Sequence, residues 1–423
     1  MRSRVYILAL LLGLSAPAFA QIAPPTMEAI TLDEAIQRAL KNNPTIGQAA
    51  QGILGAESLL QQARAATLPS VIANFINVVV DTERRFDDVV TTPRSQATLS
   101  AGLVMPILAA SRWAATTQAR DQVEIAGLST ADVRTQIAVS TAQAYLAIIA
   151  SKRQVEVSLR ALETSLAHLD YARRRLEAGA GSRVNELRAG QEVASNEARL
   201  EVTHLAVHIT QEALGVLIAA AGPVDAAAEP AFDVPASIGA EAGWMGLRPD
   251  IRLFAASERA ADRVWRDSSK DWFPTGIATF DPQALVPASI FSSARGWRFI
   301  VNFSQPVFDG GFRRGQRRFR ESELNVSRLA LTGLETQARS EVRLAQEKVR
   351  STERALAHLR SAADQANEVL KITTFAFEAG ATTNLEVVDA QRQARDEDSA
   401  AAIAQDAVQR ARLDLLTALG RFP

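Results

Sequence analysis

Apolar residues recur at intervals of seven in two long stretches of the chain. The first stretch places them at Ile148, Val155, Leu162, Leu169 and Leu176, and the second at Val342, Val349, Leu356, Ala363, Leu370 and Phe377. A seven-residue apolar repeat is typical of helices that pack together with a left-handed supercoil. The pattern therefore predicts two long helices, about 111–178 and 312–379, each roughly 100 Å in length.

Each long stretch ends in a short segment that contains glycine. The first segment reads LEAGAGS and the second reads FEAGATT, and the two lie 201 residues apart. Gly179 and Gly380 stand where the end of a helix favours a left-handed residue, and Ser182 and Thr383 stand where the next helix needs an N-cap. The pattern predicts two helical hairpins with matching tips.

Apolar and polar residues alternate in four short segments, which predicts four strands. Two of them form a hairpin near 71–106 and two form a hairpin near 275–306. The apolar positions of their second strands are Leu99, Ala101, Leu103 and Met105, and Trp297, Phe299, Val301 and Phe303. Strands of this length with one apolar face match tilted membrane-spanning strands, although soluble hairpins packed on helices alternate in the same way. Four strands cannot close a barrel in lipid, so the membrane interpretation requires an oligomer that pools them.

The two halves of the chain repeat the same features in the same order. Pro44 and Pro69 have counterparts in Pro249 and Pro274, each 205 residues later. Such self-similarity indicates an internal duplication. The expected organisation is a signal peptide over 1–20, a first repeat over 21–221 with its tip near 179–182, a linker over 222–246, and a second repeat over 247–423 with its tip near 380–384.

The N-terminus and the amino-acid composition indicate an exported protein. Arg2 and Arg4 precede a short apolar run, and Ala18-Phe19-Ala20 fits a cleavage site, so 1–20 reads as a secretory signal peptide. No later stretch offers the ~20 apolar residues of a spanning helix. The absence of cysteine excludes disulfides and lipidation of an N-terminal cysteine, so the chain is not expected to be a lipoprotein. A formal charge of −1 gives no argument for nucleic acid.

Several motifs, taken in order, give the chain a family resemblance. They are LDEA at 32–35, NNP at 42–44 and LPS at 68–70 in the first half, and RPDI at 248–251, PVFDGG at 306–311, FEAG at 377–380 and NLEVVDAQ at 384–391 in the second. Their order and duplication resemble outer-membrane efflux proteins of the TolC family in its two-repeat form. The resemblance covers nearly the whole mature chain.

This resemblance implies a mainly α fold with a membrane β-barrel. It implies a homotrimer in which four strands from each protomer close one twelve-stranded barrel in the lipid of the outer membrane. The long coiled-coil helices would form a tunnel across the periplasm. There an adaptor protein and an inner-membrane pump would dock, and cargo would pass without covalent chemistry, so no enzyme is expected.

The resemblance also assigns candidate site residues near the tips. The adaptor-docking residues are Gly179, Ala180, Gly181, Ser182, Gly380, Ala381, Thr383 and Asn384, and the channel-mouth residues are Glu386, Asp389, Phe377 and Thr382. Rings of carboxylates from Glu386 and Asp389 would favour cations. Helix capping alone also explains the glycine and cap positions, and Thr383 with Glu386 forms a capping box. The family's Tyr and Arg near the tip are replaced here by Phe377 and Thr382.

No catalytic, cofactor or metal site is expected. His204 and His208 lie four apart on a predicted helix, a spacing that suits zinc, but no third ligand is evident nearby. The leading hypothesis is a passive outer-membrane exit duct of a tripartite efflux or secretion system. The alternative is a periplasmic coiled-coil adaptor or scaffold, which the paired amphipathic strands disfavour. The sequence does not specify the cargo.

Overall fold

The computed structural model describes residues 27–235, 241–288 and 293–422. Its elements follow one another as β1 (Glu28–Ile30), α1 (Leu32–Asn42), α2 (Pro44–Ala65), β2 (Ser70–Val79), β3 (Arg84–Phe86), β4 (Val89–Thr92), β5 (Ser95–Leu108), α3 (Ala110–Glu177), α4 (Arg183–Leu217), β6 (Val224–Ala226), α5 (Glu241–Met245), α6 (Pro249–Asp267), the 3-10 helix η1 (Ser268–Trp272), β7 (Thr275–Val286), β8 (Arg295–Ser304), α7 (Phe312–Glu378) and α8 (Asn384–Ala418). The expected signal peptide lies outside the described residues.

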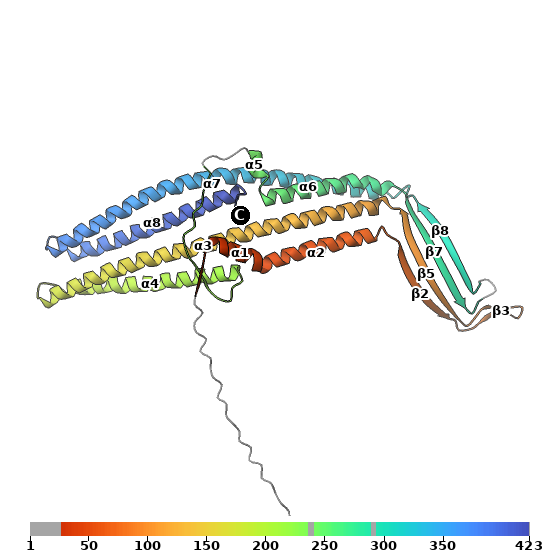
Figure 1. Cartoon of the computed structure of the whole chain (residues 1–423), viewed down its shortest axis with the longest axis horizontal. Helices are drawn as coiled ribbons and strands as arrows, with labels where there is room; N and C mark the ends of the chain where they lie inside the picture. The colour runs from red at the N-terminus through yellow and green to blue at the C-terminus, as the bar shows by residue number, and fades with distance from the viewer. Residues whose placement is uncertain (1–26, 236–240, 289–292, 423) are drawn as a thin grey trace, which may run out of the picture.

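The molecule is elongated, with a sheet at one end and two helical tips at the other (Figure 1). The helices α3 and α7 run the length between these ends, and α4 and α8 fold back along them. The shorter helices α2 and α6 cover the half of α3 and α7 that is next to the sheet. The tips are therefore far from the strands.

The two long helices confirm the prediction from the seven-residue repeats. They contain 68 and 67 residues, and neither is interrupted. The two seven-residue apolar repeats, called ladders below, are partly buried where α4 packs on α3 and α8 packs on α7. Their buried members include Ile148, Leu169, Val342 and Phe377. Burial of this apolar stripe stabilises helices of such length, because propensity alone supports only short ones.

The strands form one antiparallel sheet in the order β2-β5-β7-β8, so the hairpins of the two halves meet where β5 pairs with β7. Side chains that face each other across the strands keep to one face, as in the row Val71, Leu103, Phe280 and Phe299. That face is apolar and exposed, and it also carries Phe75, Leu99, Met105, Trp297, Val301 and Phe303. The expected alternation is confirmed.

The connection between β2 and β5 contains the small hairpin β3–β4, which the sequence pattern did not predict. Strand β5 begins at Ser95. The β-branched run Val89–Thr92 favours a strand, and the intervening Asp87 and Asp88 take positive φ angles of 45° and 61°, which Asp tolerates better than most residues.

A short two-stranded sheet, β1 with β6, crosses the middle of the long helices and is called the belt below. Strand β1 pairs in parallel with β6, and the fully buried Tyr145 of α3 lies within hydrogen-bond distance of the carbonyl oxygens of Ile30 (3.1 Å) and Ala228 (2.8 Å). Its hydroxyl also accepts a bond from the Ala228 backbone N–H. These contacts fasten the beginning of the chain and the linker to α3. In the described part of the chain, no helix is both long and apolar enough to cross a membrane.

Candidate functional site at the hairpin tips

The two tips have the same backbone geometry. Gly179 and Gly380 take φ angles of +73° and +80° directly after the helix ends. In each tip the next residue donates back into the last turn, from Ala180 to the carbonyl of Arg175 at 2.9 Å and from Ala381 to that of Ala376 at 2.8 Å. These bonds are those of a Schellman C-cap, which explains why glycine stands at both positions.

The predicted N-caps are also present. The hydroxyl oxygen of Ser182 accepts from the backbone N–H of Val184 at 3.2 Å, and that of Thr383 accepts from the backbone N–H of Glu386 at 3.4 Å. Within the described residues, the Glu386 carboxylate makes no hydrogen bond back to Thr383. The capping box is therefore formed on one side only, and the Glu386 side chain is free for other contacts.

The tip residues differ in exposure. Ala180, Ser182, Ala381 and Thr383 are exposed together with both tip glycines that follow the helices, whereas Gly181 and Thr382 are half-buried. Asn384 was expected to be exposed, and this expectation is wrong, because only 3 % of its surface is accessible. Its side-chain oxygen lies 2.7 Å from Nε2 of the buried His168 on α3, so Asn384 connects the two hairpins.

Phe377 is buried as well, with 6 % of its surface exposed. Its ring lies against His168, Tyr171 and Arg175 of the first hairpin, with centroid separations of 5.5 Å and 5.7 Å to the first two rings and 5.5 Å from its centroid to the Arg175 guanidinium carbon. Aromatic and cation–π contacts of this kind favour the tilted and edge-on arrangements seen here. Within one protomer, Phe377 thus joins the hairpins.

A cleft of about 360 Å³ separates the tips. It is lined by Arg175 and Arg188 of the first hairpin and by Thr382, Asn384 and Leu385 of the second, among others. The Thr382 hydroxyl and the Asn384 side-chain NH₂ are buried and have no hydrogen-bond partner in the described part of the chain. Unpaired buried polar groups are costly, so these two groups weaken the junction between the tips.

Glu386 and Asp389 lie one helical turn apart on the first turns of α8, and both are exposed. Neither carboxylate forms an ion pair among the described residues. The buried neighbours Val387, Val388 and Ala390 turn the opposite face of this helix into the hairpin. The two carboxylates therefore share one solvent-facing side of α8, as their spacing predicts.

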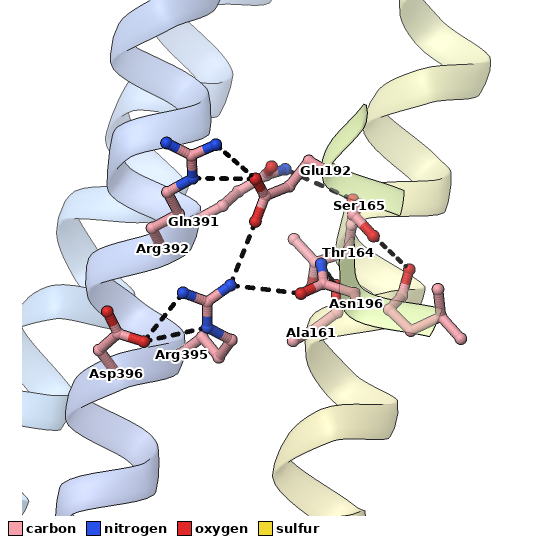
Figure 2. Close-up of polar contacts among 10 residues, drawn as sticks. Ala161, Thr164, Ser165, Glu192, Asn196, Gln391, Arg392, Arg395 and Asp396 are labelled. Carbon is pink, nitrogen blue, oxygen red and sulfur yellow. Dashed lines mark hydrogen bonds and ion pairs between the residues drawn. The ribbon is translucent and has the colours of Figure 1, made fainter. Parts of the chain in front are cut away.

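Further from the tips, a buried carboxylate holds α4 to α8 (Figure 2). Glu192 of α4 is only 2 % exposed, and it accepts hydrogen bonds from Arg392 at 2.9 Å and from Arg395 at 3.1 Å. Arg395 also donates to the side-chain oxygen of Asn196 at 3.3 Å and pairs with Asp396. Two guanidinium groups thus compensate the buried charge, which lets the carboxylate lie between the hairpins.

Sequence reasoning missed this cluster. The signal was present in Glu192, which lies between Ala189, Val193 and Asn196 on the buried face of α4 rather than among solvent-facing residues. Its partners Arg392 and Arg395 lie 200 or more residues away, so only the tertiary structure brings them together.

Two further polar contacts continue the junction of α3 and α8 toward the belt. Gln154 and Ser399 exchange hydrogen bonds of 2.9 Å and 3.4 Å, and Arg153 forms ion pairs with Asp406 and with Glu229 of the linker. Burial raises the pKa of Asp406 above its ordinary value despite the neighbouring Arg153. Burial also acts to raise the pKa of Glu229, but hydrogen bonds from Arg153 and Gln409 outweigh it and lower that pKa.

His204 and His208 are exposed on α4. Among the described residues, no group of three or more His, Asp or Glu side chains could hold a metal ion. The structure gives this pair no further ligand.

The family described as outer membrane efflux protein matches residues 35–220 and 246–421, which together make up most of the chain. Outer membrane protein OprJ of Pseudomonas aeruginosa is 26 % identical over 408 residues, covering 91 % of this chain and 83 % of the relative.

Solved structures support the same fold. A membrane protein from Pseudomonas aeruginosa superposes with a TM-score of 0.82 at 21 % identity, covering 93 % of this chain and 91 % of that one. The open state of the Neisseria gonorrhoeae MtrE outer membrane channel superposes with a TM-score of 0.79 at 18 % identity, covering 94 % and 93 %. At these identities the likeness shows the fold, and it confirms the resemblance to TolC-like channels.

Replacing Glu192 should loosen the connection between the hairpins. Glu192→Ala leaves Arg395 buried without its carboxylate, and breaking a buried pair costs about 3–5 kcal/mol. Backbone amides of α8 near Arg395 that exchange through hairpin separation should then exchange about a hundredfold faster or more, since each 1.4 kcal/mol is tenfold. Glu156→Ala is the matched control, because its pair with Arg160 is exposed. Equal exchange in the two variants would contradict the role given to Glu192.

Acid should weaken the contact at His168. Burial lowers the pKa of His168 below its ordinary value, although the bond to Asn384 opposes this. Neutral His168 therefore favours the folded contact at pH values above about 6.5, and that stability is lost as the pH falls from there through the lowered pKa. Thermal unfolding followed by circular dichroism from pH 7.5 to 5.5 should show this loss.

His168→Gln should flatten that pH dependence, whereas His358→Gln should leave it unchanged, because His358 is exposed. A pH dependence that is the same in wild type and His168→Gln would argue against a contribution from this residue.

Proposed function

Because the chain belongs to the outer membrane efflux protein family, we propose that it is the outer-membrane exit duct of a tripartite efflux or secretion system. Family membership makes it a transport protein of the outer membrane rather than an enzyme. The observation that carries the more specific proposal is the exposed apolar face of the sheet, set at the far end of the molecule from the polar tips.

The edges of the sheet support a trimer. In the order β2-β5-β7-β8, strands β2 and β8 have a free edge each. An open edge in lipid leaves backbone groups unpaired, so β8 of one copy would pair with β2 of the next. Three copies would close a twelve-stranded barrel whose outer surface is the apolar row around Leu103, Phe280 and Phe299.

Helices α2 and α7 both leave apolar side chains exposed. The edge formed by α2 exposes Leu54 and Leu59, and the edge formed by α7 exposes Phe319, Val326 and Leu329. Two different surfaces of one chain that fit each other generate a ring when the rotation closes. One ring of three copies would therefore bring together both the strand edges and the helix surfaces, and the helices would enclose a tunnel.

The tips would be the docking site of a periplasmic adaptor that connects the duct to an inner-membrane pump. The exposed Ala180, Ser182, Ala381 and Thr383 offer their backbone and hydroxyl groups. Adaptor binding there would act on the contacts of Phe377 and Asn384, which hold the hairpins together. This gives a route from docking to opening.

Glu386 and Asp389 would line the mouth of this tunnel. In a trimer each exposed carboxylate repeats three times around the axis, and rings of carboxylates attract cations. Phe377 is buried within the protomer, so its contribution to a closed mouth would be to fix the position of the second hairpin rather than to block the opening.

The proposal is tested on the purified full chain. In detergent it should run as a heat-sensitive oligomer of three copies, because the ring buries edges that are exposed in one copy. In planar lipid bilayers it should conduct ions, whereas a boiled sample should not. Recovery of the protein as a monomer in the soluble periplasmic fraction would refute the proposal.

The mouth assignment predicts a change in ion selectivity. Replacing Glu386 and Asp389 by Gln and Asn should lower the preference for cations, because the rings lose their charge while the side chains keep their shape. Reversal potentials under a salt gradient measure this preference. The matched control is Glu156→Gln with Glu163→Gln, two exposed carboxylates on α3 away from the tips. Unchanged selectivity in the Glu386 and Asp389 variant would place these side chains away from the ion path.

A further inference from the structure

Helix α7 begins with a run of arginines shortly after the last strand of the sheet. Strand β8 ends at Ser304 and α7 begins at Phe312, and the first nine residues of the helix read FRRGQRRFR. A rise of 1.5 Å per residue keeps all of them within about 15 Å of the start of the helix. The arginines therefore lie at the level where the sheet meets the helices (Figure 1).

Two of these arginines are used by the fold. Arg313 is buried, donates a hydrogen bond of 2.6 Å to the carboxylate of Asp309, and has its guanidinium carbon 4.3 Å from the ring centroid of Trp272. Arg320 forms an ion pair with Asp271 at 2.7 Å. Both contacts hold the start of α7 against η1 and the segment that follows β8.

The other three, Arg314, Arg317 and Arg318, are exposed and are called the basic patch below. In the part of the chain that the structure describes, none of the three forms an ion pair or a hydrogen bond through its side chain. Arg317 lies only near the ring of Trp265, at 5.8 Å from its centroid. Glu321, one turn later, is exposed as well and pairs with none of them. The charges of the basic patch are therefore available to a partner.

The first half of the chain has no such patch. Helix α3 ends at Glu177, 201 residues before the end of α7 at Glu378, so the equivalents of the three arginines are Trp113, Thr116 and Thr117. Both helices are continuous through these positions. The helix itself therefore does not require arginine there, and packing within the chain does not explain the patch.

The basic patch lies on the side of the molecule that also carries part of the linker. Arg339, about seven turns further along the same face of α7 as Arg314, pairs with Glu241 of α5 at 2.6 Å. The linker and α5 thus add a second layer on this side of the long helices (Figure 1). In the proposed duct a second layer on the inner side would fill the tunnel, so this side is the outer one.

Exposed aromatic side chains lie at the same junction of strands and helices. Phe273 precedes β7, Phe308 lies between β8 and α7, and Trp113 lies in the first turn of α3, and all three are exposed. Aromatic residues collect where a membrane meets water, and the apolar face of the sheet begins directly beyond them. The basic patch is therefore next to the level expected for lipid head groups.

We propose that the basic patch binds the phosphate of an anionic phospholipid in the periplasmic leaflet of the outer membrane. This inference rests on the proposed function, because it uses the position of the sheet in the membrane. Guanidinium groups present paired donors that fit phosphate oxygens. Arg314 and Arg318 lie one turn apart and Arg317 is adjacent, so they are placed to share one head group. Three bound lipids, one on each copy, would hold the duct at one depth.

Lipid retained by the purified full chain measures this binding. Trimers in detergent are mixed with equal amounts of phosphatidylglycerol and phosphatidylethanolamine, and native mass spectrometry counts each lipid bound. Wild type should prefer phosphatidylglycerol. The triple variant Arg314→Gln, Arg317→Gln and Arg318→Gln should retain at least tenfold less of it, because each arginine near an anionic surface contributes about fivefold.

The matched control removes three exposed arginines of α7 that lie further from the sheet, Arg343→Gln, Arg350→Gln and Arg354→Gln, and should bind lipid as wild type does. Single variants keep the test independent of whether the triple variant assembles. Arg314→Gln and Arg318→Gln should each lower the retention of phosphatidylglycerol about fivefold.

Trimer formation and ion conduction are measured on the same samples. Wild-type trimers that conduct ions, combined with equal lipid retention in the patch variants and the control, would overturn the lipid site and leave the proposed duct intact. Binding of the patch to isolated peptidoglycan, with no preference for phosphatidylglycerol, would overturn it as well. Absence of any trimer would instead refute the proposed function, and the lipid site with it.

Discussion

The structure depends on the burial of one apolar stripe along each long helix. Without the ladder from Ile148 to Leu176, α4 would have nothing to pack on, and without its counterpart on α7 neither would α8. Helix propensity alone would not keep isolated helices of 67 or 68 residues fully folded in water. The stripes convert them into two stiff hairpins, and this stiffness sets the distance between the sheet and the tips.

Apolar packing of this kind is repetitive and does not by itself align one hairpin with the other. The alignment comes from polar groups that are buried between them: Glu192 with Arg395, and His168 with Asn384. Such contacts add little net stability, because the desolvation of the groups offsets much of their attraction, but they penalise every displaced arrangement. In the proposed duct they would suit a junction that holds the tips together in one state and lets them separate in another.

Much of the fold could be predicted from the sequence because its signals are local or periodic. The seven-residue repeats, the capping residues Ser182 and Thr383, and the alternation in β8 each act over a few neighbouring residues. The junction between the hairpins could not be predicted in this way, because its contacts join residues that are far apart in the sequence. Nothing local distinguishes the buried Asn384 from an exposed tip residue, since its burial depends on His168, which lies 216 positions earlier.

The hairpin β3–β4 was missed because charged flanking residues concealed the short β-branched run that forms it. The position of Phe377 was predicted as the last member of a ladder, yet its contacts with the other hairpin follow only from the packing of α3 against α7 and α8.

The duplicated tips have the same backbone geometry but differ in charge. Both end in a left-handed glycine and a Schellman cap, and both expose a glutamate, Glu177 or Glu378, but the first also exposes Arg183 and Arg188, whereas the second exposes Glu386 and Asp389. Backbone geometry is fixed by the need to reverse the chain in five residues, and it leaves the surrounding side chains free to change. In the proposed trimer the six tips would therefore be alike in shape and alternate in charge. A partner built from identical copies would meet two chemically distinct surfaces around one ring.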